Sequence, residues 1–329
     1  VRPEQFVAIT DPATPLEFLA RDTGFRAVVP HPVDVGGRYA ALTAVGMLPA
    51  ALVGIDGPEL LARARRIDVA RAKDYGATLA AAALSGKDKL VLAPPAPVAA
   101  LASWIEQLVA ESSGKDGRGV VPVVDDPGAA RSADAQVVSD FSADPLDLGA
   151  EFLRWEYATW ALCDRLGVNA FDQPDVEAAK RLARAELERT GEARSPLATL
   201  APHELCRLAR PGDYFAILAY LPATPDVRSR LARLRDRWRA VLGTVTTLGF
   251  GPRYLHSTGQ LHKGGPNTGL FLVITADVAE DAEIPGFNRT FGDLHAAQAR
   301  GDLRALLERG RRVAHVHLAR PADIDQLAP

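Results

Sequence analysis

The sequence predicts an α/β protein with mostly parallel sheets whose two faces are covered by helices. Apolar runs at residues 214–221 and 270–275 have the length of strands but no polar alternation, which is typical of strands buried on both faces. Stretches of helical periodicity at residues 226–241 and 291–308 alternate with these runs, as in proteins with parallel sheets. Ligands of such sheets bind beyond the carboxyl ends of the strands, so we expect the chemistry in loops that follow strands.

The individual elements can be placed in order along the chain. We expect strands at residues 6–10, 26–29, 89–93, 120–124, 136–140, 214–221, 244–248, 270–275 and 312–318. We expect helices at residues 14–23, 38–53, 58–84, 98–112, 146–166, 174–190, 226–241 and 291–308, and a charged loop at 191–196. Small and charged residues at 85–89 interrupt the pattern, which predicts a domain boundary there.

Composition argues against several classes of function. The 329 residues include 38 basic and 41 acidic ones, and the net charge of −3 does not suit a protein that binds nucleic acid through a basic face. No apolar run approaches the ~20 residues of a membrane helix, and the polar start VRPEQ does not resemble a secretory leader. Cys163 and Cys206 are too few for a disulfide framework, so we expect a reducing, cytoplasmic location.

Two common nucleotide-binding motifs are absent or weak. The Gly-Lys pairs at Gly86 and Gly114 are each followed by Asp and lack the upstream glycine of a phosphate-binding P-loop. A dinucleotide fingerprint could begin at Gly249 and Gly251, but Tyr254 occupies the position of its third glycine. A nicotinamide-dependent enzyme is therefore a weak alternative that rests on two glycines.

The histidines give no strong metal-binding pattern. His203 is followed by Glu, but Arg207 stands where a zinc-protease helix has its second histidine. His315 and His317 lie two residues apart in a predicted strand, so they share one face, as metal ligands can. We favour a pair of partly buried or edge histidines over a metal site, and we expect no metal.

Four blocks of sequence are not explained by packing alone. They are VGGRY at residues 35–39, EQLVAESSGK at 106–115, FDQPDVEAAK at 171–180 and RYLHSTGQLHKGG at 253–265. Together with FVAITDP near the start, they resemble the phosphoglucose isomerase (glucose-6-phosphate isomerase) family, whose members contain two sugar-isomerase (SIS) domains. The resemblance implies a flavodoxin-like fold, with part of the first SIS domain at residues 1–85 and the second at 86–329.

The end of the chain resembles a subset of this family more specifically. The fourth block and the later segments TGLFLVIT, IPG, AQARGDL and GRRVAHVHL are similar to the isomerase half of bacterial transaldolase–phosphoglucose isomerase fusions. As in those fusions, the histidine block follows the lysine block. The family's Ser/Thr-rich loop that binds the sugar phosphate is absent from this sequence, so we expect that an upstream segment or a transaldolase domain belongs with it.

The implied reaction is the aldose–ketose isomerisation of glucose 6-phosphate and fructose 6-phosphate, a step of glycolysis and gluconeogenesis. A carboxylate base must move a proton between adjacent carbons through an enediolate, and partial burial raises the pKa of such a base toward neutrality. Glu111 ends the apolar helix WIEQLVAE and matches the family's base. The alternative is a surface glutamate at a helix end, where the helix dipole disfavours a carboxylate.

Arg38 matches the family's arginine that stabilises the negative charge of the enediolate. Gly36 and Gly37 precede it and would let the backbone approach the substrate closely. The alternative for Arg38 is a salt bridge at the start of a helix. Gln107, one helical turn before Glu111, matches a glutamine that contacts the ligand.

Ring opening requires one group that protonates the ring oxygen and one that removes the hydroxyl proton. His256 matches the family's catalytic histidine through its spacing to Gln260, and His262 is the second choice. Lys180 matches the active-site lysine; the alternative is a solvated helix lysine. Gln173, seven residues earlier and so on the same face of a helix, is expected to bind substrate.

The resemblance implies no organic cofactor, because acid–base chemistry is sufficient. It implies a homodimer, since active sites of the family take a histidine from the neighbouring subunit, and it implies neither a nucleic-acid nor a membrane partner. The alternative from another functional class is a SIS-type module that binds a sugar phosphate without catalysis.

Overall fold

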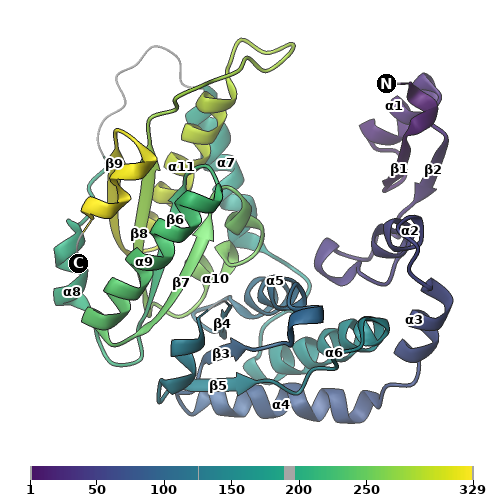
Figure 1. Cartoon of the computed structure of the whole chain (residues 1–329), viewed down its shortest axis with the longest axis horizontal. Helices are drawn as coiled ribbons and strands as arrows, with labels where there is room; N and C mark the ends of the chain where they lie inside the picture. The colour runs from purple at the N-terminus through teal and green to yellow at the C-terminus, as the bar shows by residue number, and fades with distance from the viewer. Residues whose placement is uncertain (1, 125, 189–196, 328–329) are drawn as a thin grey trace.

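The strands of the protein form three parallel sheets, as the computed structural model shows for residues 2–124, 126–188 and 197–327 (Figure 1). Every pairing between the labelled strands in these ranges is parallel. Long helices connect the strands and pack against the two larger sheets. This α/β architecture confirms the predicted fold class.

The first sheet lies in an N-terminal unit, which we define as residues 2–35. Its two strands, β1 (Val7–Thr10) and β2 (Ala27–Pro30), are joined by α1 (Pro15–Thr23). The hydroxyl of Thr14 accepts a hydrogen bond from a backbone N–H of the first turn of α1, and Gly24 ends the helix with a φ of 77°, which suits a residue without a side chain.

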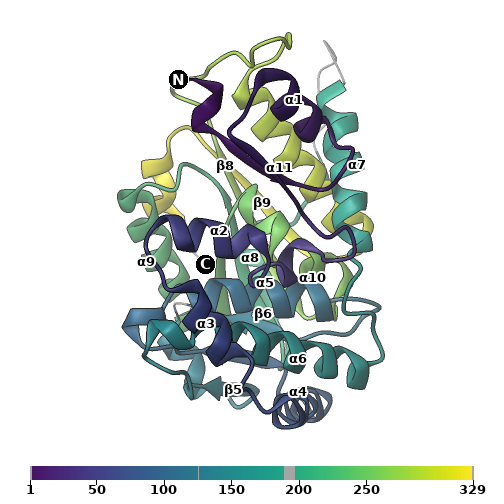
Figure 2. The same ribbon diagram turned by 90° about the vertical axis from the view of Figure 1, so that its right-hand side faces the viewer.

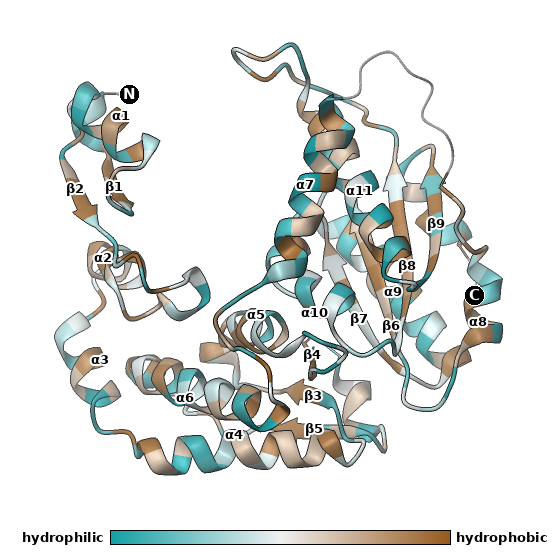
Figure 3. Cartoon of the chain, turned by 180° about the vertical axis from the view of Figure 1, so that it is seen from behind, coloured by the Kyte–Doolittle hydropathy of each residue, from teal (hydrophilic) through white to brown (hydrophobic). Residues whose placement is uncertain are grey.

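The N-terminal unit exposes much apolar surface. Phe6, Phe18 and Leu19 are 45%, 56% and 52% exposed, although they belong to or flank the small sheet and its helix. Figures 1 and 3 show β1, β2 and α1 projecting away from the two larger sheets. Two strands alone do not make an independently stable sheet in water, and the apolar side chains of this unit stay largely exposed in the single chain.

Short helices lead from the N-terminal unit to the rest of the chain. They are the 3₁₀ turn η2 (Gly37–Tyr39), α2 (Ala44–Leu52) and α3 (Gly57–Ala64). The single helix expected at residues 38–53 is therefore wrong, because Thr43 caps a new helix at α2. The helix expected at 58–84 also divides, because Asp68 caps a second helix, α4 (Val69–Leu84).

The second sheet has three strands, in the order β4-β3-β5. Its strands and its two further helices are β3 (Lys89–Leu92), β4 (Val121–Val123), β5 (Ala135–Val138), α5 (Leu101–Ser113) and α6 (Leu148–Leu166). Buried side chains of α4, α5 and α6 form one core with β3, in which Trp155 is the largest member. The division at residue 85 stays a prediction; α4 ends beside it and contributes Leu79 to this core.

The third sheet has four strands, in the order β7-β6-β8-β9. Its strands are β6 (Tyr214–Tyr220), β7 (Val245–Phe250), β8 (Gly269–Ala276) and β9 (Arg312–Leu318). The helices of this region are α7 (Pro174–Glu188), α8 (Pro202–Leu208), α9 (Pro225–Leu242), α10 (Gly259–Gly264) and α11 (Phe291–Glu308). The sequence did not predict α8 or α10, and the loop expected at 191–196 lies outside the described residues.

Helices cover both faces of this sheet. Every residue of β6 is buried, and alternate residues face opposite sides. Phe215 and Ile217 pack with α9, whereas Ala216 and Leu218 pack with α11. Figure 2 shows α11 lying beside α7, with which it makes extensive contact. Strands buried on both faces explain the continuous apolar runs in the sequence.

A small apolar cluster joins the two larger sheets. Val91 and Val123 of the three-stranded sheet contact Val245 of the four-stranded sheet, and all three are nearly inaccessible to solvent. Among the described residues, no helix has the length and apolar character needed to cross a membrane.

Candidate active site

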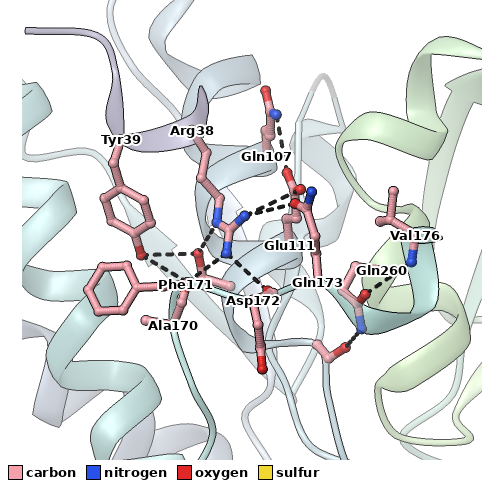
Figure 4. Close-up of polar contacts among 12 residues, drawn as sticks. Arg38, Tyr39, Gln107, Glu111, Ala170, Phe171, Asp172, Gln173, Val176 and Gln260 are labelled. Atoms are coloured by element: carbon pink, nitrogen blue, oxygen red, sulfur yellow. Dashed lines mark hydrogen bonds and ion pairs between the residues drawn. The ribbon is translucent and has the colours of Figure 1, made fainter. Parts of the chain in front are cut away.

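Arg38 is the centre of a buried polar cluster, although it lies in a short 3₁₀ turn near the N-terminal unit (Figure 4). Its Nε donates to Oγ of Ser112 at 2.9 Å, and its Nη1 donates to Oε1 of Gln173 at 2.9 Å. Its Nη2 donates to the carbonyl oxygens of Ala170 at 2.7 Å and Asp172 at 3.1 Å. The side chain is therefore held in one orientation by separate segments of the chain.

Glu111 supplies the negative charge beside this guanidinium. Its Oε1 lies 3.4 Å from Nη1 of Arg38, and its Oε2 accepts a hydrogen bond from Nε2 of Gln107 at 3.2 Å. Arg38 and Glu111 are each only 5% exposed. A buried charge is costly unless it is paired, so the two groups stabilise each other in this position.

Tyr39 and Phe171 close one side of the cluster. The hydroxyl of Tyr39 lies 3.1 Å from Oγ of Ser112, and its ring packs on that of Phe171 with centroids 5.2 Å apart. Burial raises the pKa of Tyr39 to about 12, so its hydroxyl keeps its proton at neutral pH. A cavity of about 320 Å³ adjoins the cluster here and is lined by both rings.

Gln260 of α10 connects the elements that carry the cluster. Its Oε1 accepts the backbone N–H groups of Asp175 at 2.9 Å and Val176 at 3.4 Å, at the start of α7. Its Nε2 donates to the carbonyl of Gly114 at 3.0 Å, directly after α5, and to Oδ2 of Asp175 at 2.7 Å. One buried amide thus fixes the end of α5 relative to the start of α7.

Lys115 is a second buried cation of this region. Its Nζ lies 2.7 Å from Oδ1 of Asp172 and donates to the carbonyl of Asn169. Burial lowers the pKa of Lys115, and the neighbouring carboxylate of Asp172 opposes that shift. The same loop thereby holds Lys115 and, through its carbonyl oxygens, Arg38.

The two glycines before Arg38 are not required by the fold. Gly36 and Gly37 have ample room, because a Cβ added at either would meet no atom within 4 Å. The glycines at 249 and 251 differ: a Cβ there would come within 2.9 Å of Tyr254 and 2.6 Å of Tyr220, respectively. Close packing against tyrosines therefore accounts for that second pair.

The two candidate histidines have opposite environments. His256 ends the 3₁₀ turn η6 (Arg253–His256) and is exposed. His262 is buried among aromatic rings, and its Nδ1 lies 2.9 Å from the hydroxyl of Tyr214. Burial holds the pKa of His262 well below its ordinary value, so this ring is neutral at physiological pH.

Lys180 lies on the exposed side of α7. Its Nζ pairs with Oε1 of Glu177 at 2.8 Å, and its side chain is 48% exposed. Gln173 precedes the first helical residue, Pro174, so the two side chains do not share a helical face as expected. Gln173 instead reaches Arg38, which Lys180 does not contact in the part of the chain that the structure describes.

Four predicted residues therefore meet in the cluster, and two lie elsewhere. Arg38, Gln107, Glu111 and Gln173 are linked by direct contacts, whereas His256 and Lys180 are exposed. Glu111 lies in the last turn of α5, at the helix end where the sequence placed it, and not in a loop that follows a strand. A carboxylate at the C-terminal end of a helix is disfavoured by the helix dipole, and the guanidinium of Arg38 at 3.4 Å opposes that effect.

Sequence reasoning missed several members of the cluster. Ser112 and Lys115 lie in the block ESSGK, and Tyr39 follows Arg38, but no pattern assigned them a partner. Their contacts join segments far apart in the sequence, so only the fold reveals them. Among the described residues, no group of three or more His, Cys, Asp or Glu side chains is arranged to hold a metal ion.

The chain is related in sequence to glucose-6-phosphate isomerases over about a third of its length. It is 43% identical over 128 residues to glucose-6-phosphate isomerase of Symbiobacterium thermophilum and 42% identical over 117 residues to that of Heliobacterium modesticaldum. It is 38% identical over 128 residues to a probable glucose-6-phosphate isomerase of Haloarcula marismortui. These alignments cover 35%, 32% and 36% of this chain and 28%, 26% and 29% of the respective relatives.

Two other comparisons add little. No protein-family model matches the chain. A hypothetical protein of known structure from Thermus thermophilus aligns over 87% of this chain and 80% of its own, with 17% identity and a TM-score of 0.32. That score is too low to establish a shared fold.

Proposed function

We propose that the chain is the isomerase part of a protein that interconverts glucose 6-phosphate and fructose 6-phosphate. The observation that carries this proposal is the buried pair of Glu111 and Arg38, whose carboxylate and guanidinium groups lie 3.4 Å apart. The names of the sequence relatives favour the same reaction. Because the chain aligns with under a third of their length, activity is proposed for the protein to which it contributes.

Glu111 acts as the base in this proposal. It removes a proton from the carbon next to the carbonyl of the open-chain sugar and returns it to the adjacent carbon. Gln107 holds one carboxylate oxygen, which restricts the rotation of the base. Arg38 stabilises the negative oxygen of the enediolate, and its fixed hydrogen bonds mean that little reorganisation accompanies the appearance of that charge.

Ring opening requires groups that this cluster does not contain. We assign it to His256, with Lys180 as a further cation at the site, on the basis of the family resemblance alone. Since His256 is exposed and sits on a turn apart from the cluster, a second copy of the chain is the source that we propose for it. The active protein is then a homodimer in which each site takes a histidine from its partner.

The sugar phosphate must also be bound. We propose that a further α/β segment, either upstream in the same polypeptide or in a separate chain, packs on the N-terminal unit and supplies the phosphate-binding loop. The exposed apolar side chains of Phe6, Phe18 and Leu19 support such a contact.

The test is proton exchange during turnover. The protein together with this segment is incubated with fructose 6-phosphate in D₂O, and the product is followed by NMR and by a coupled dehydrogenase assay. Isomerisation through an enediolate predicts glucose 6-phosphate with deuterium at C2. Saturable binding without any exchange at carbon would instead favour the alternative function, a non-catalytic sugar-phosphate module.

A further inference from the structure

The short helix α10 depends on its neighbours for its position. It has six residues, too few for a helix to persist by itself in water, so its contacts decide where it lies. Every residue from Gly259 to Lys263 is buried. The loop that follows α5 packs against α10, and so does α11. The proposed function gives this helix no part in the reaction.

Two hydrogen bonds and one close approach join α10 to the loop directly after α5. Nε2 of Gln260 donates to the carbonyl of Gly114 at 3.0 Å, and the backbone N–H of Gly117 donates to the carbonyl of Gly264 at 2.9 Å. A Cβ at position 114 would come within 2.4 Å of the backbone of α10, so glycine permits this approach. Gly114 is three residues past Glu111, and the position of α10 therefore affects where that carboxylate lies.

The same helix also holds the start of α7. Oε1 of Gln260 accepts the backbone N–H groups of Asp175 and Val176, as Figure 4 shows for Val176. These two residues follow Gln173 closely in the chain, and the side chain of Gln173 accepts a hydrogen bond from Arg38. The backbone segments that carry two members of the cluster are thus both attached to α10.

An ion pair that is almost inaccessible to solvent attaches α10 to α11. Nζ of Lys263 lies 2.5 Å from Oδ1 of Asp302, and the two side chains are 2% and 1% exposed. The other carboxylate oxygen accepts a hydrogen bond from the hydroxyl of Tyr254, which lies in η6. Burial and the nearby carboxylate raise the pKa of Tyr254 well above its ordinary value, so the hydroxyl keeps its proton. One side chain of α11 therefore holds residues 254–263 at both ends.

Stability alone is a weak reason for such a pair. The cost of removing two charges from water can exceed their attraction, and apolar side chains of similar volume often stabilise a core equally well. An ion pair can instead specify a position, because the ammonium group of α10 must lie opposite one carboxylate of α11. A six-residue helix with contacts on several sides requires such a fixed position.

We propose that Lys263 and Asp302 are positioning residues for Glu111. Their ion pair fixes α10 on α11, and α10 fixes the end of α5 that carries the carboxylate. This inference rests on the proposed function, in which Glu111 is the base. A displacement of about 1 Å can lower the rate by about 10²-fold, so the pair contributes to kcat although neither side chain belongs to the Arg38 cluster.

The test removes the pair without leaving a buried charge. The double variant Lys263→Met/Asp302→Leu replaces both groups by apolar side chains of similar volume, so urea titration should give a free energy of unfolding close to that of the unchanged chain. In the complete isomerase, kcat for fructose 6-phosphate should fall about tenfold, whereas KM should change less than about twofold.

Glu186→Gln is the matched control. Glu186 is a second buried carboxylate that pairs with α11, through Arg300 at 2.9 Å and Arg304 at 2.8 Å, but it lies near the opposite end of α7 from Gln173. Its substitution should lower the free energy of unfolding and leave kcat unchanged. A loss of kcat in the double variant alone then reports position and not stability.

Two further measurements trace the effect to α10. Gln260→Met added to the double variant should lower kcat no further than the larger of the two separate losses, because both act through the same helix. The side-chain amide of Gln107, which donates to Oε2 of Glu111 at 3.2 Å, reports the position of the carboxylate without turnover. Its ¹⁵N resonance in the full chain should shift in the double variant and stay unchanged in Glu186→Gln.

A folded double variant with normal kcat would overturn the proposal, and so would additive losses with Gln260→Met or an unchanged Gln107 resonance. A double variant that fails to fold would assign the pair a structural role and would also contradict it. Absence of turnover by the unchanged complete protein would refute the proposed function instead. In that case the Gln107 resonance still shows whether the ion pair positions Glu111.

Discussion

The Arg38 cluster and the segment at residues 253–265 were both expected to carry catalytic groups, but they differ in how they are built. In the cluster, Arg38 and Glu111 are 5% exposed, and each is held by at least two partners. In the segment, His256 is exposed, whereas Gln260 is buried and donates a hydrogen bond to the carbonyl of Gly114 at the end of α5. The groups proposed for enediolate chemistry are therefore in contact within one chain, whereas the group proposed for ring opening is exposed and lies outside that cluster.

The difference matters for what a substitution would change. A side chain that several neighbours hold in place also contributes to the fold. Its removal should therefore lower both the activity and the free energy of unfolding. A group on the surface can be removed without loss of stability, so its effect should appear only in activity. The following four experiments separate these cases.

The largest effect is expected for Glu111→Gln. The variant keeps the shape and the contact with Gln107 but cannot take a proton from carbon, so kcat should fall by at least about 10³-fold. The measurement is the coupled assay on the complete isomerase. Glu59→Gln, a surface glutamate paired with Arg63, is the control and should retain normal activity. Retained activity in Glu111→Gln would exclude this residue as the base.

A smaller loss is expected for Arg38→Lys. Lysine keeps the charge but cannot contact Ser112, Gln173 and the carbonyl of Ala170 at once, because it lacks the planar fork of donors. We expect kcat to fall about 10²-fold and the free energy of unfolding to fall by about 2 kcal/mol. Steady-state kinetics and urea titration check the two effects. A fall in activity with unchanged stability would show that the hydrogen bonds of Arg38 do not support the fold.

Mixing two inactive variants tests the source of the histidine. Glu111→Gln and His256→Ala each lack one group, but a mixed dimer has one site that receives Glu111 and His256 from different chains. If half of the dimers are mixed and half of their sites are intact, activity should recover to about a quarter of the normal value. No recovery after mixing and reassociation would mean that His256 acts within its own chain or not at all.

The smallest effect is a pH dependence of stability that arises from the buried His262. The pKa of His262 is depressed in the folded protein, so below about pH 6.5 the unfolded chain binds a proton that the folded state does not. Its contribution to stability is complete above that pH and is lost as the pH falls, by about 2 kcal/mol at about pH 5. Urea titrations should show a weaker pH dependence in His262→Phe than in the unchanged chain. Equal slopes for the variant and the unchanged chain would contradict the burial of His262.

The strands were predictable because they are apolar on both faces. Residues 214–221 and 312–318 match β6 and β9 almost to the residue. Helix boundaries were less predictable where local capping outweighs periodicity, as at Thr43 and Asp68. The helix α8 was missed because its seven residues offer too short a pattern.

The candidate site was only partly predictable. The resemblance pointed to Arg38, Gln107, Glu111 and Gln173, and the structure brings these four together. It offered no reason to expect that Gln260 would connect α5 to α7, because that contact depends on where three helices meet. The hydrogen-bond partners of the β9 histidines could not be predicted from the sequence either. Thr275 and Asp277 belong to β8 and the loop after it, and only the fold brings them beside His317.

The hydrogen bonds of Arg38 also have a consequence for the order of folding. They join residues separated by 74, 135 and 132 positions in the chain. Closing loops of that length costs entropy before any contact compensates for it, so we expect these bonds to form late, after the core of α4, α5 and α6. Release of residues 36–39 alone would then remove the guanidinium from beside Glu111 while that core stays folded, so the candidate site could be lost without global unfolding.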